Sequence, residues 1–501
     1  MRLRSLSIIL LLCITGSAFC VRTFATTRKQ VLDLSQGKVV LADYLAEWGN
    51  PLISGSWLNW AFHECGVRHD PHNLLPNEMR DIASKYYPLI GPYDTSDPAV
   101  LEYHIRLAQA SGIDGFLVDW WGLQNVGTRL EVNRTFGELL KLSGQLNFGV
   151  AIDYTAPIFY LNTGGVSHVS ISDRAQALKA VHDDLAFVIK SFGSSPAYLK
   201  FQGKPVIALY LAEEPFTVDE WKQIYAALKI EGLEAYYISL TVSKRGELTF
   251  YPYVQGFFPW IWSEDLEDAT SFIHDHAGQL RAFAAGHDIR WGLVVRPGFD
   301  DSPVAHWCAG KPVQVDRRDG TLYNETWRAA LANDPRWILI STFNDWNEAT
   351  IIEPSLQFGY QYLYTTNYFA SGFKNAQSNY AGIPVPYMIY NATVAVRQAE
   401  SEGRSAGLDP AYEALQLAKQ VFQSGQYSDA ARLAKQATQL ALQATIPQTS
   451  TTGSSTLMMP LQPVSSTGWN LTYVVAAIGI VTFVAISVMA IKRRNPRTRQ
   501  E

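Results

Sequence analysis

The sequence predicts an α/β protein: a (β/α)8 TIM barrel, followed by a short helical hairpin, a Ser/Thr/Pro stalk and one transmembrane helix. Three observations lead to this prediction. Eight short apolar runs recur along the chain, amphipathic segments separate several of them, and both chain ends differ in composition from a globular domain. Such apolar runs are typical of strands buried on both faces of a parallel sheet. Eight of them alternating with helices favour a closed barrel over an open sheet.

The eight candidate strands each end in polar or aromatic residues. They are 54–60, 112–121, 148–154, 204–211, 234–240, 254–262, 290–299 and 336–346. Between them, residues 98–111 and 175–191 repeat apolar positions at helical intervals, which predicts amphipathic helices. No Gly-x-Gly-x-x-Gly follows the first candidate strand, which argues against a dinucleotide-binding sheet. The predicted barrel domain covers residues 40–395.

Both ends of the chain carry membrane-targeting patterns. Residues 1–25 begin with two arginines in the first four positions, followed by an apolar stretch and small residues, which predicts a secretory signal peptide. Residues 471–491 contain no charge, and at about 1.5 Å per residue a helix of this length spans roughly 30 Å, enough to cross a bilayer. The basic tail at residues 492–501 then places the C-terminus in the cytoplasm. We therefore expect a single-pass protein of the cell membrane whose N-terminal domain is extracytoplasmic.

Two segments separate the predicted barrel from the membrane. Residues 408–445 predict a helical hairpin that resembles one tetratricopeptide-type repeat. A single repeat cannot bury its own face, so we expect it to pack on the barrel or to lead into the stalk as a spacer, and binding of a partner protein is the alternative. Residues 446–470 predict an extended stalk. The net charge of −5 and the isoelectric point near 6.1 argue against nucleic acid as the main partner.

Carboxylates and aromatic rings gather where the predicted strands end, which is where a TIM barrel carries its active site. Rings can stack on the apolar faces of sugars, while carboxylates can bind hydroxyls and move protons, so this mixture suits a carbohydrate. An acid at a strand end can also cap the next helix, which is the alternative for Asp119 and Asp153. The candidate substrate-binding residues are Trp60, Asp119, Trp120, Trp121, Asp153, Tyr154, Glu213, Trp260, Trp262, Arg296, Trp346 and Asn347.

Asp345 and Glu348 are the candidate catalytic residues. They lie three residues apart at the end of the last predicted strand. Glycoside cleavage usually needs two carboxyl groups, one to protonate the leaving oxygen and one to act as nucleophile or base. Residues three apart in a helical turn project to the same side, with Cβ atoms roughly 5–6 Å apart. So close a pair can raise one pKa and keep that group protonated near neutral pH.

Two stretches resemble glycoside hydrolase family 99, which contains the endo-α-mannosidases and is related to WbsX-like proteins. These are residues 86–121 and the sequence NDWNEATIIEP at 344–354. The resemblance implies a (β/α)8 barrel and a retaining mechanism that needs no metal or cofactor. In that mechanism one carboxylate deprotonates the mannose 2-hydroxyl, which attacks C1 to form a 1,2-anhydro sugar. The other acid protonates the departing oxygen and later activates water.

By position, the resemblance assigns Asp345 to the 2-hydroxyl and Glu348 to the general acid/base role. The family's first acid is usually Glu, so Asp345 is one methylene shorter, and about 1 Å of lost reach can cost on the order of a hundredfold in rate. Glu353 matches an acid further along the motif, and we expect it to be structural. The expected partner is an oligosaccharide or polysaccharide glycan. The alternatives are a non-catalytic glycan-binding receptor and a WbsX-like polysaccharide-processing enzyme.

Overall fold

A computed structural model describes most of the chain between its two ends. The described residues are 32–64, 66–123, 130–160, 171, 173–211, 215–240, 247–304 and 311–447. The predicted signal peptide, Glu213, the predicted transmembrane helix and the basic tail lie outside these residues. Within them, no helix has both the length and the apolar character needed to cross a bilayer.

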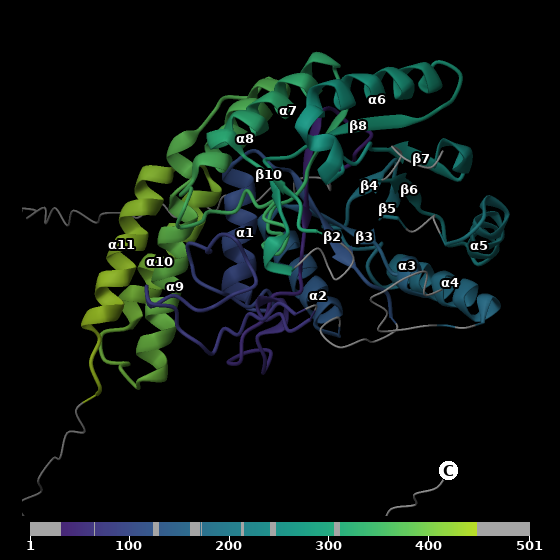
Figure 1. Ribbon diagram of the computed structural model, residues 1–501. Coiled ribbons are helices and arrows are strands. Elements are labelled where there is room, and N and C mark those ends of the chain that lie inside the picture. Colours follow the sequence, from purple (N-terminus) through teal and green to yellow (C-terminus); the bar gives the residue numbers. More distant parts are fainter. Residues whose placement is uncertain are drawn as a thin grey trace, which may run out of the picture. The chain divides into compact units, whose positions relative to one another are not determined.

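Eight parallel strands form a closed barrel at the centre of the molecule (Figure 1). The strands are β1 (Val39–Tyr44), β2 (Gly115–Trp120), β3 (Gly149–Tyr154), β5 (Lys204–Leu209), β6 (Tyr236–Ser239), β7 (Val254–Phe257), β8 (Arg290–Val295) and β11 (Trp337–Ile340). They neighbour one another in chain order, and β1 also pairs with β11, so the barrel has no free edge. The predicted closed parallel barrel is confirmed.

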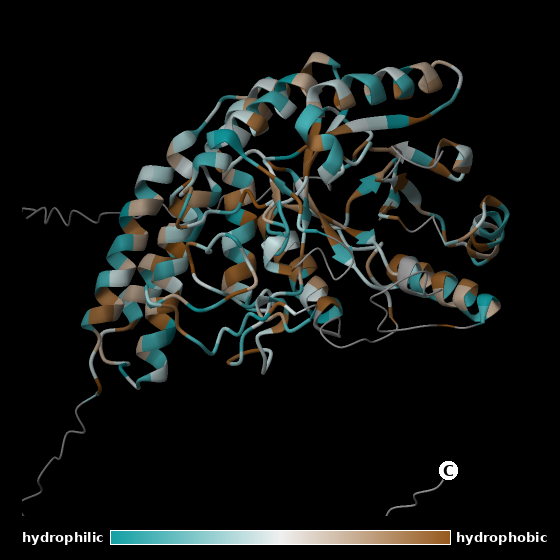
Figure 2. Cartoon of the chain, viewed as in Figure 1, coloured by the Kyte–Doolittle hydropathy of each residue, from teal (hydrophilic) through white to brown (hydrophobic). Residues whose placement is uncertain are grey.

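Three short strands lie outside this ring. Strand β4 (Lys200–Phe201) pairs antiparallel with β5, and β9 (Phe299–Asp300) pairs with β10 (Gln314–Val315). The hydrophobic colouring in Figure 2 follows the central strands. All six residues of β1 are buried, as a strand covered on both faces requires.

Helices surround the barrel and continue beyond it. They are α1 (Pro98–Ala110), α2 (Leu130–Leu146), α3 (Pro157–Tyr160), α4 (Arg174–Ser191), α5 (Val218–Ile230), α6 (Ala269–Ala284), α7 (Thr321–Ala332), α8 (Gln361–Phe373), α9 (Val385–Ser401), α10 (Asp409–Gln423) and α11 (Tyr427–Gln443). Helices α1 and α4 confirm the two amphipathic helices predicted at 98–111 and 175–191. Both begin at an aspartate whose side chain accepts a backbone N–H of the first turn.

The first barrel strand is not the predicted one. Residues 54–60 form no strand; they lie in the loop after β1 and end in a 3₁₀ turn at Leu58–Trp60. Gly55 has a φ of +76°, which an extended strand does not allow. The run Val39–Tyr44 takes its place because it can pair on both edges, with β2 and with β11.

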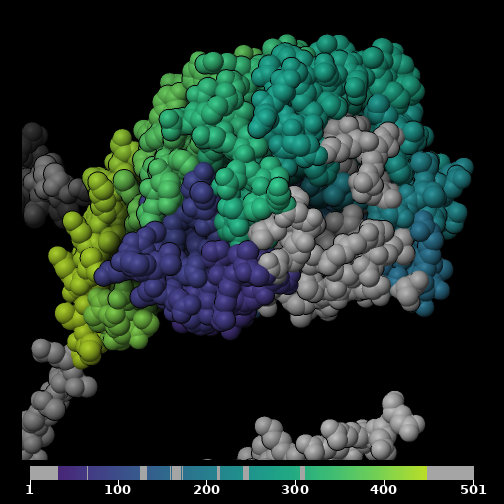
Figure 3. All heavy atoms as spheres, viewed as in Figure 1, coloured from purple at the N-terminus to yellow at the C-terminus, as the bar shows by residue number. Residues whose placement is uncertain are grey.

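The predicted helical hairpin is present. Helices α10 and α11 are joined by the short link 424–426, and both pack against α9, which itself packs on α1 of the barrel. In the space-filling view the yellow hairpin lies along one side of the molecule, against green and purple-to-blue residues (Figure 3). The hairpin is therefore attached to the barrel, as expected for a single repeat that cannot cover its own apolar face.

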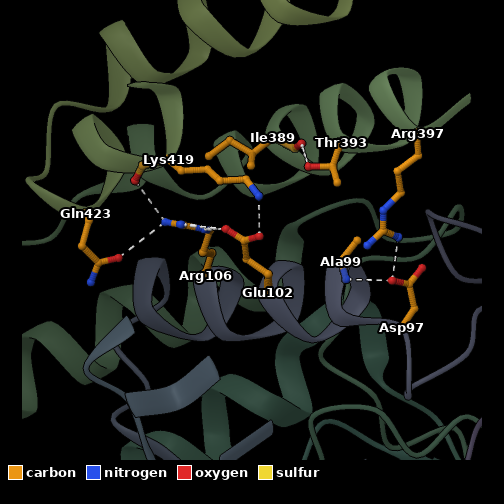
Figure 4. Close-up of polar contacts among 9 residues, drawn as sticks. All are labelled: Asp97, Ala99, Glu102, Arg106, Ile389, Thr393, Arg397, Lys419 and Gln423. Atoms are coloured by element: carbon orange, nitrogen blue, oxygen red, sulfur yellow. Dashed lines mark hydrogen bonds and ion pairs between the residues drawn. The ribbon is translucent and has the colours of Figure 1, made fainter. Parts of the chain in front are cut away.

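A buried ion-pair network attaches the hairpin to α1 (Figure 4). Glu102 binds Arg106 at 2.8 Å and Lys419 of α10 at 2.6 Å, and only 3% of the Arg106 side chain is exposed. Arg106 also contacts Gln423 of α10 at 3.4 Å. Burial alone would raise the pKa of Glu102, but the Arg106 and Lys419 cations hold it below its usual value. The network is thus charged at neutral pH and links barrel to hairpin.

We expect Glu102→Ala to lower the free energy of unfolding by about 3 kcal/mol, because the buried Arg106 guanidinium loses its carboxylate partner. The measurement is denaturant unfolding of the full chain. Glu138→Ala is the matched control, since Glu138 pairs with Lys141 on the surface of α2 and should change stability by less than about 0.5 kcal/mol. Equal effects of the two substitutions would contradict a stabilising role for the network.

Candidate active site

The first three barrel strands end in the same kind of triplet, an apolar residue followed by aspartate and an aromatic residue. The triplets are Ala42-Asp43-Tyr44, Val118-Asp119-Trp120 and Ile152-Asp153-Tyr154. Successive side chains of a strand point to opposite faces, so in each triplet the aspartate and the aromatic ring lie on opposite sides of the barrel wall.

The aromatic residues identify the outer side of the barrel wall, because each one hydrogen-bonds to a residue of the surrounding helices. Tyr44 contacts His104 of α1 at 2.9 Å, the Trp120 indole donates to Asn133 of α2 at 2.5 Å, and the Tyr154 hydroxyl donates to Asp184 of α4 at 2.7 Å. The three rings therefore face outward. Asp43, Asp119 and Asp153 face the barrel interior near its carboxyl end.

Asp345 and Glu348 share one turn just beyond β11. The Asp345 backbone N–H donates to Thr342 Oγ1 at 2.9 Å, and the Glu348 backbone N–H donates to Asp345 Oδ1 at 3.0 Å. Asp345 is 8% exposed, whereas 30% of the Glu348 side chain is exposed. Asp345 thus lies deep in the site, and Glu348 reaches toward solvent.

Arg296 follows β8 and contacts the exposed acid. Its Nη2 lies 3.4 Å from Glu348 Oε2, and its Nη1 donates to the Ile261 carbonyl at 2.6 Å. The guanidinium also lies 5.7 Å from the Trp260 ring and 4.9 Å from the Phe299 ring. These contacts hold a positive charge, almost fully buried, beside the carboxylates.

Electrostatic interactions link the acids into one cluster. Burial, then the negative charge of Glu348, raises the pKa of Asp345 well above its ordinary value, and Arg296 opposes this only in part. Burial, then the charge of Asp119, raises the pKa of Asp43 in the same way. We call the following residues the carboxylate cluster: Asp43, Asp119, Asp153, Asp345 and Glu348.

Aromatic residues lie beside the cluster. Tyr210, which follows β5, lies 4.9 Å from the Trp260 ring and 6.3 Å from the Trp262 ring. Burial and the nearby charges of Glu348 and Asp153 raise the pKa of the Tyr210 hydroxyl, so it stays protonated and can donate a hydrogen bond. Rings beside carboxylates at the carboxyl end of a barrel form an arrangement that can bind a sugar and transfer protons to it.

A sequence profile described as Glycosyl hydrolase family 99 matches residues 36–157 and 164–377, more than half of the chain. The chain belongs to this family. Its relatives include a glycoprotein endo-alpha-1,2-mannosidase-like protein of Danio rerio, 23% identical over 339 residues that cover 62% of this chain and 69% of the relative. A glycoprotein endo-alpha-1,2-mannosidase of Xenopus laevis is 22% identical over 330 residues, with the same coverage.

The barrel is also similar to a solved family 99 structure, the endo-alpha-mannosidase of Bacteroides thetaiotaomicron. The TM-score is 0.51 at 22% identity, and the match covers 70% of this chain and all of the solved chain. This similarity concerns the fold. Family membership makes the chain a glycoside hydrolase with endo-α-mannosidase relatives.

Four predicted substrate-binding residues of this family 99 chain lie in the packed interior. Trp120 and Tyr154 were expected to face substrate, but the strand alternation turns both toward the helices, as described above. Trp60 packs 4.3 Å from the Trp48 ring and donates its indole N–H to the Tyr93 carbonyl at 2.7 Å. Trp346 is fully buried. These rings support the site from behind and do not line it.

Trp346 and Asn347 face away from the carboxylate cluster because the turn directs Asp345 and Glu348 toward it. The Trp346 indole donates to Tyr93 Oη at 3.0 Å and to Glu353 Oε2 at 3.1 Å. Asn347 Nδ2 donates to the carbonyl of Ala83 at 2.7 Å. Both side chains therefore hold the motif in place, a role that the sequence analysis did not assign to them.

Glu353 is structural, as expected. Its carboxylate accepts the Tyr93 hydroxyl at 2.7 Å and lies 3.1 Å from His104 Nε2. Arg317 fixes the same segment from another side by donating to the carbonyls of Ala349 and Ile351 at 2.6 and 2.9 Å. The loop that carries the catalytic candidates is thus held by buried polar contacts on both sides.

Of the remaining candidates, Asp119, Asp153, Trp260, Trp262 and Arg296 lie with or beside the carboxylate cluster. Trp121 follows β2 and is half-buried, and Glu213 lies outside the described residues. Sequence reasoning missed Asp43 and Tyr210. Asp43 could have been found, because VVLADY repeats the pattern of GFLVDW and GVAIDY.

In the described part of the chain, no group of three or more His, Cys, Asp or Glu side chains could hold a metal ion.

The raised pKa of Asp345 makes a prediction for stability. The folded state holds this proton more tightly than the unfolded chain, so the stability contributed by protonated Asp345 should be lost as the pH rises from about 3.8 through the raised pKa. Asp345→Asn should therefore show a flatter dependence of melting temperature on pH than the wild type. Asp275→Asn, at an exposed position of α6, is the control and should follow the wild type. If melting temperature depends on pH in the same way in all three proteins, the pKa of Asp345 is not raised in the folded state.

Proposed function

We propose that the protein is a retaining glycoside hydrolase that cleaves α-mannosidic linkages within glycans at the carboxylate cluster. The observation that carries the proposal is the shared turn of Asp345 and Glu348 at the carboxyl end of the barrel, with Arg296 beside Glu348. Family membership and the endo-α-mannosidase relatives support the sugar and the internal site of cleavage.

In the first step of the proposed mechanism the two acids have different roles, which follow from how deeply each is buried. In the reactive state the one proton of the acid pair lies on Glu348 and Asp345 is ionised, although burial raises the pKa of Asp345. The Asp345 carboxylate takes the proton of the mannose 2-hydroxyl, and O2 attacks C1 to form a 1,2-anhydro sugar. The bond from C1 to the leaving oxygen breaks, and that oxygen takes the proton of Glu348. The greater exposure of Glu348 suits contact with a leaving group that extends toward solvent.

The second step reverses these proton transfers. Glu348, now a carboxylate, takes a proton from water, and the water oxygen attacks C1. The C1–O2 bond opens, and O2 recovers its proton from Asp345, so both acids return to their first state. Two inversions at C1 retain the anomeric configuration.

Local contacts support the role of the shorter acid. The Glu348 N–H engages one Asp345 oxygen at 3.0 Å, which fixes the orientation of the carboxyl group. Burial that raises the pKa of Asp345 makes the ionised form a stronger base. A fixed orientation and a stronger base partly offset the loss of one methylene of reach.

We expect Glu348→Gln to lower kcat on an α-mannan oligosaccharide by about 10²–10⁴-fold while sugar binding is retained, because glutamine has no proton to give to the leaving oxygen. Turnover and binding are measured on the full chain. Glu325→Gln, which alters an ion pair of α7 with Arg318 away from the cluster, is the control. Undiminished turnover would remove Glu348 from the acid role. Binding without turnover by the wild type would favour the glycan-binding receptor.

The proposed hydrolase is anchored at the cell membrane by residues 471–491, with its barrel extracytoplasmic. The uncharged segment and the basic tail of the sequence support this proposal. We expect the full chain to stay in the membrane pellet after alkaline extraction and a chain that ends at residue 470 to be released. Release of the full chain under the same conditions would contradict the anchor.

A further inference from the structure

Asp43 is a buried acid of the carboxylate cluster that the proposed mechanism does not use. It is 6% exposed and lies at the end of β1, facing the barrel interior because Tyr44 faces α1. Its Oδ1 atom is buried and has no hydrogen-bond partner among the described residues. A buried polar oxygen without a partner is unfavourable, and most such oxygens in proteins are satisfied.

The surroundings of Asp43 place its carboxyl group among the acids of the proposed site. Asp119, Arg296 and Glu348 lie near enough to Asp43 to interact with it electrostatically, and Asp345 interacts with Asp43 as well. The only backbone contact of Asp43 to the catalytic loop uses its carbonyl, which accepts the Phe343 N–H at 2.8 Å. The Asp43 side chain takes no part in this contact, and its Oδ1 is left without a partner among the described residues.

We propose that Asp43 is a third substrate-contacting acid: its Oδ1 accepts a hydrogen bond from a hydroxyl of the sugar that binds beside Asp345 and Glu348. The proposal rests on the proposed carbohydrate site but not on turnover. A sugar hydroxyl is the donor that fits, since it can reach a buried oxygen without adding charge. Oδ1 can accept this bond whether Asp43 is ionised or protonated.

The test separates one hydroxyl from the others. Full-length Glu348→Gln protein, which cannot complete turnover, is titrated with methyl α-mannobioside and with each of its monodeoxy derivatives. The same titrations are repeated with Asp43→Leu and Asp43→Asn added. We expect removal of one particular hydroxyl to weaken binding about tenfold when Asp43 is present and to have almost no effect in the Asp43→Leu protein. The other deoxy derivatives should show the same penalties in both proteins.

Asp184→Asn is the matched control, because Asp184 is also a buried aspartate but lies on the outer side of the wall, where Tyr154 donates to it. It should change all affinities by one common factor. Asp43→Asn carries the test if Asp43→Leu does not fold: a changed penalty for one hydroxyl alone supports the proposal. Deoxy penalties that Asp43 substitutions leave unchanged would overturn it while leaving the hydrolase intact.

The remaining outcomes also discriminate. If the wild-type protein shows no turnover but Asp43 substitutions still change the penalty for one particular hydroxyl, the hydrolase proposal is overturned and Asp43 remains a binding residue. If neither the mannobioside nor any derivative binds at millimolar concentration, both the Asp43 proposal and the proposed mannoside specificity are overturned.

Discussion

The pairing of the first barrel strand with the last is the contact on which the site depends. Strands β1 and β11 run parallel from Val39 opposite Trp337 to Ala42 opposite Ile340. Hydrogen bonds continue past the strand ends, since Phe343 donates to the Asp43 carbonyl and Asn344 exchanges two hydrogen bonds with the Leu45 backbone at 2.8 and 2.9 Å. Because of this closure, Asp43 from the first strand lies near the turn that carries Asp345 and Glu348 after the last strand.

Bringing the acids of the carboxylate cluster together in a buried site costs free energy, because they repel one another. Contacts with a neighbouring cation reduce this cost. Like charges in a buried site raise one another's pKa, and the Arg296 cation offsets part of the repulsion. On the far side of the same loop, Glu353 has donors from Tyr93 and Trp346 and lies beside His104. One face of the loop is thus held by these hydrogen bonds, while the other face carries Asp345 and Glu348.

Much of the fold could be predicted because the sequences of buried parallel strands are nearly continuous apolar runs. Seven of the eight barrel strands lie within predicted segments, and the missed one, Val39–Tyr44, precedes the tryptophan-rich run 54–60 that was predicted as the first strand. Apolar content alone could not separate these two, because Trp57 and Trp60 are also buried, in an aromatic cluster of the loop that follows β1. Only pairing partners decide between a strand and such a cluster.

The site was predictable at the level of strand ends but not of side-chain direction. Treating every strand-end residue as a ligand placed Trp120 and Tyr154 in the pocket, although the two-residue period of a strand sends them outward when Asp119 and Asp153 point inward. Trp346 and Asn347 could not be placed from the sequence, because their partners Tyr93 and Ala83 are more than 250 positions away along the chain. A turn, unlike a strand, has no simple period from which to infer direction.

Strand β1 has a consequence for the closure of the barrel. It supplies one strand of the closed barrel wall and one acid of the carboxylate cluster. A chain that began beyond Tyr44 would keep all of the described helices, but its sheet would be open and Asp43 would be missing. Strand β1 is therefore required for the barrel to close, because no other described strand pairs with both β2 and β11.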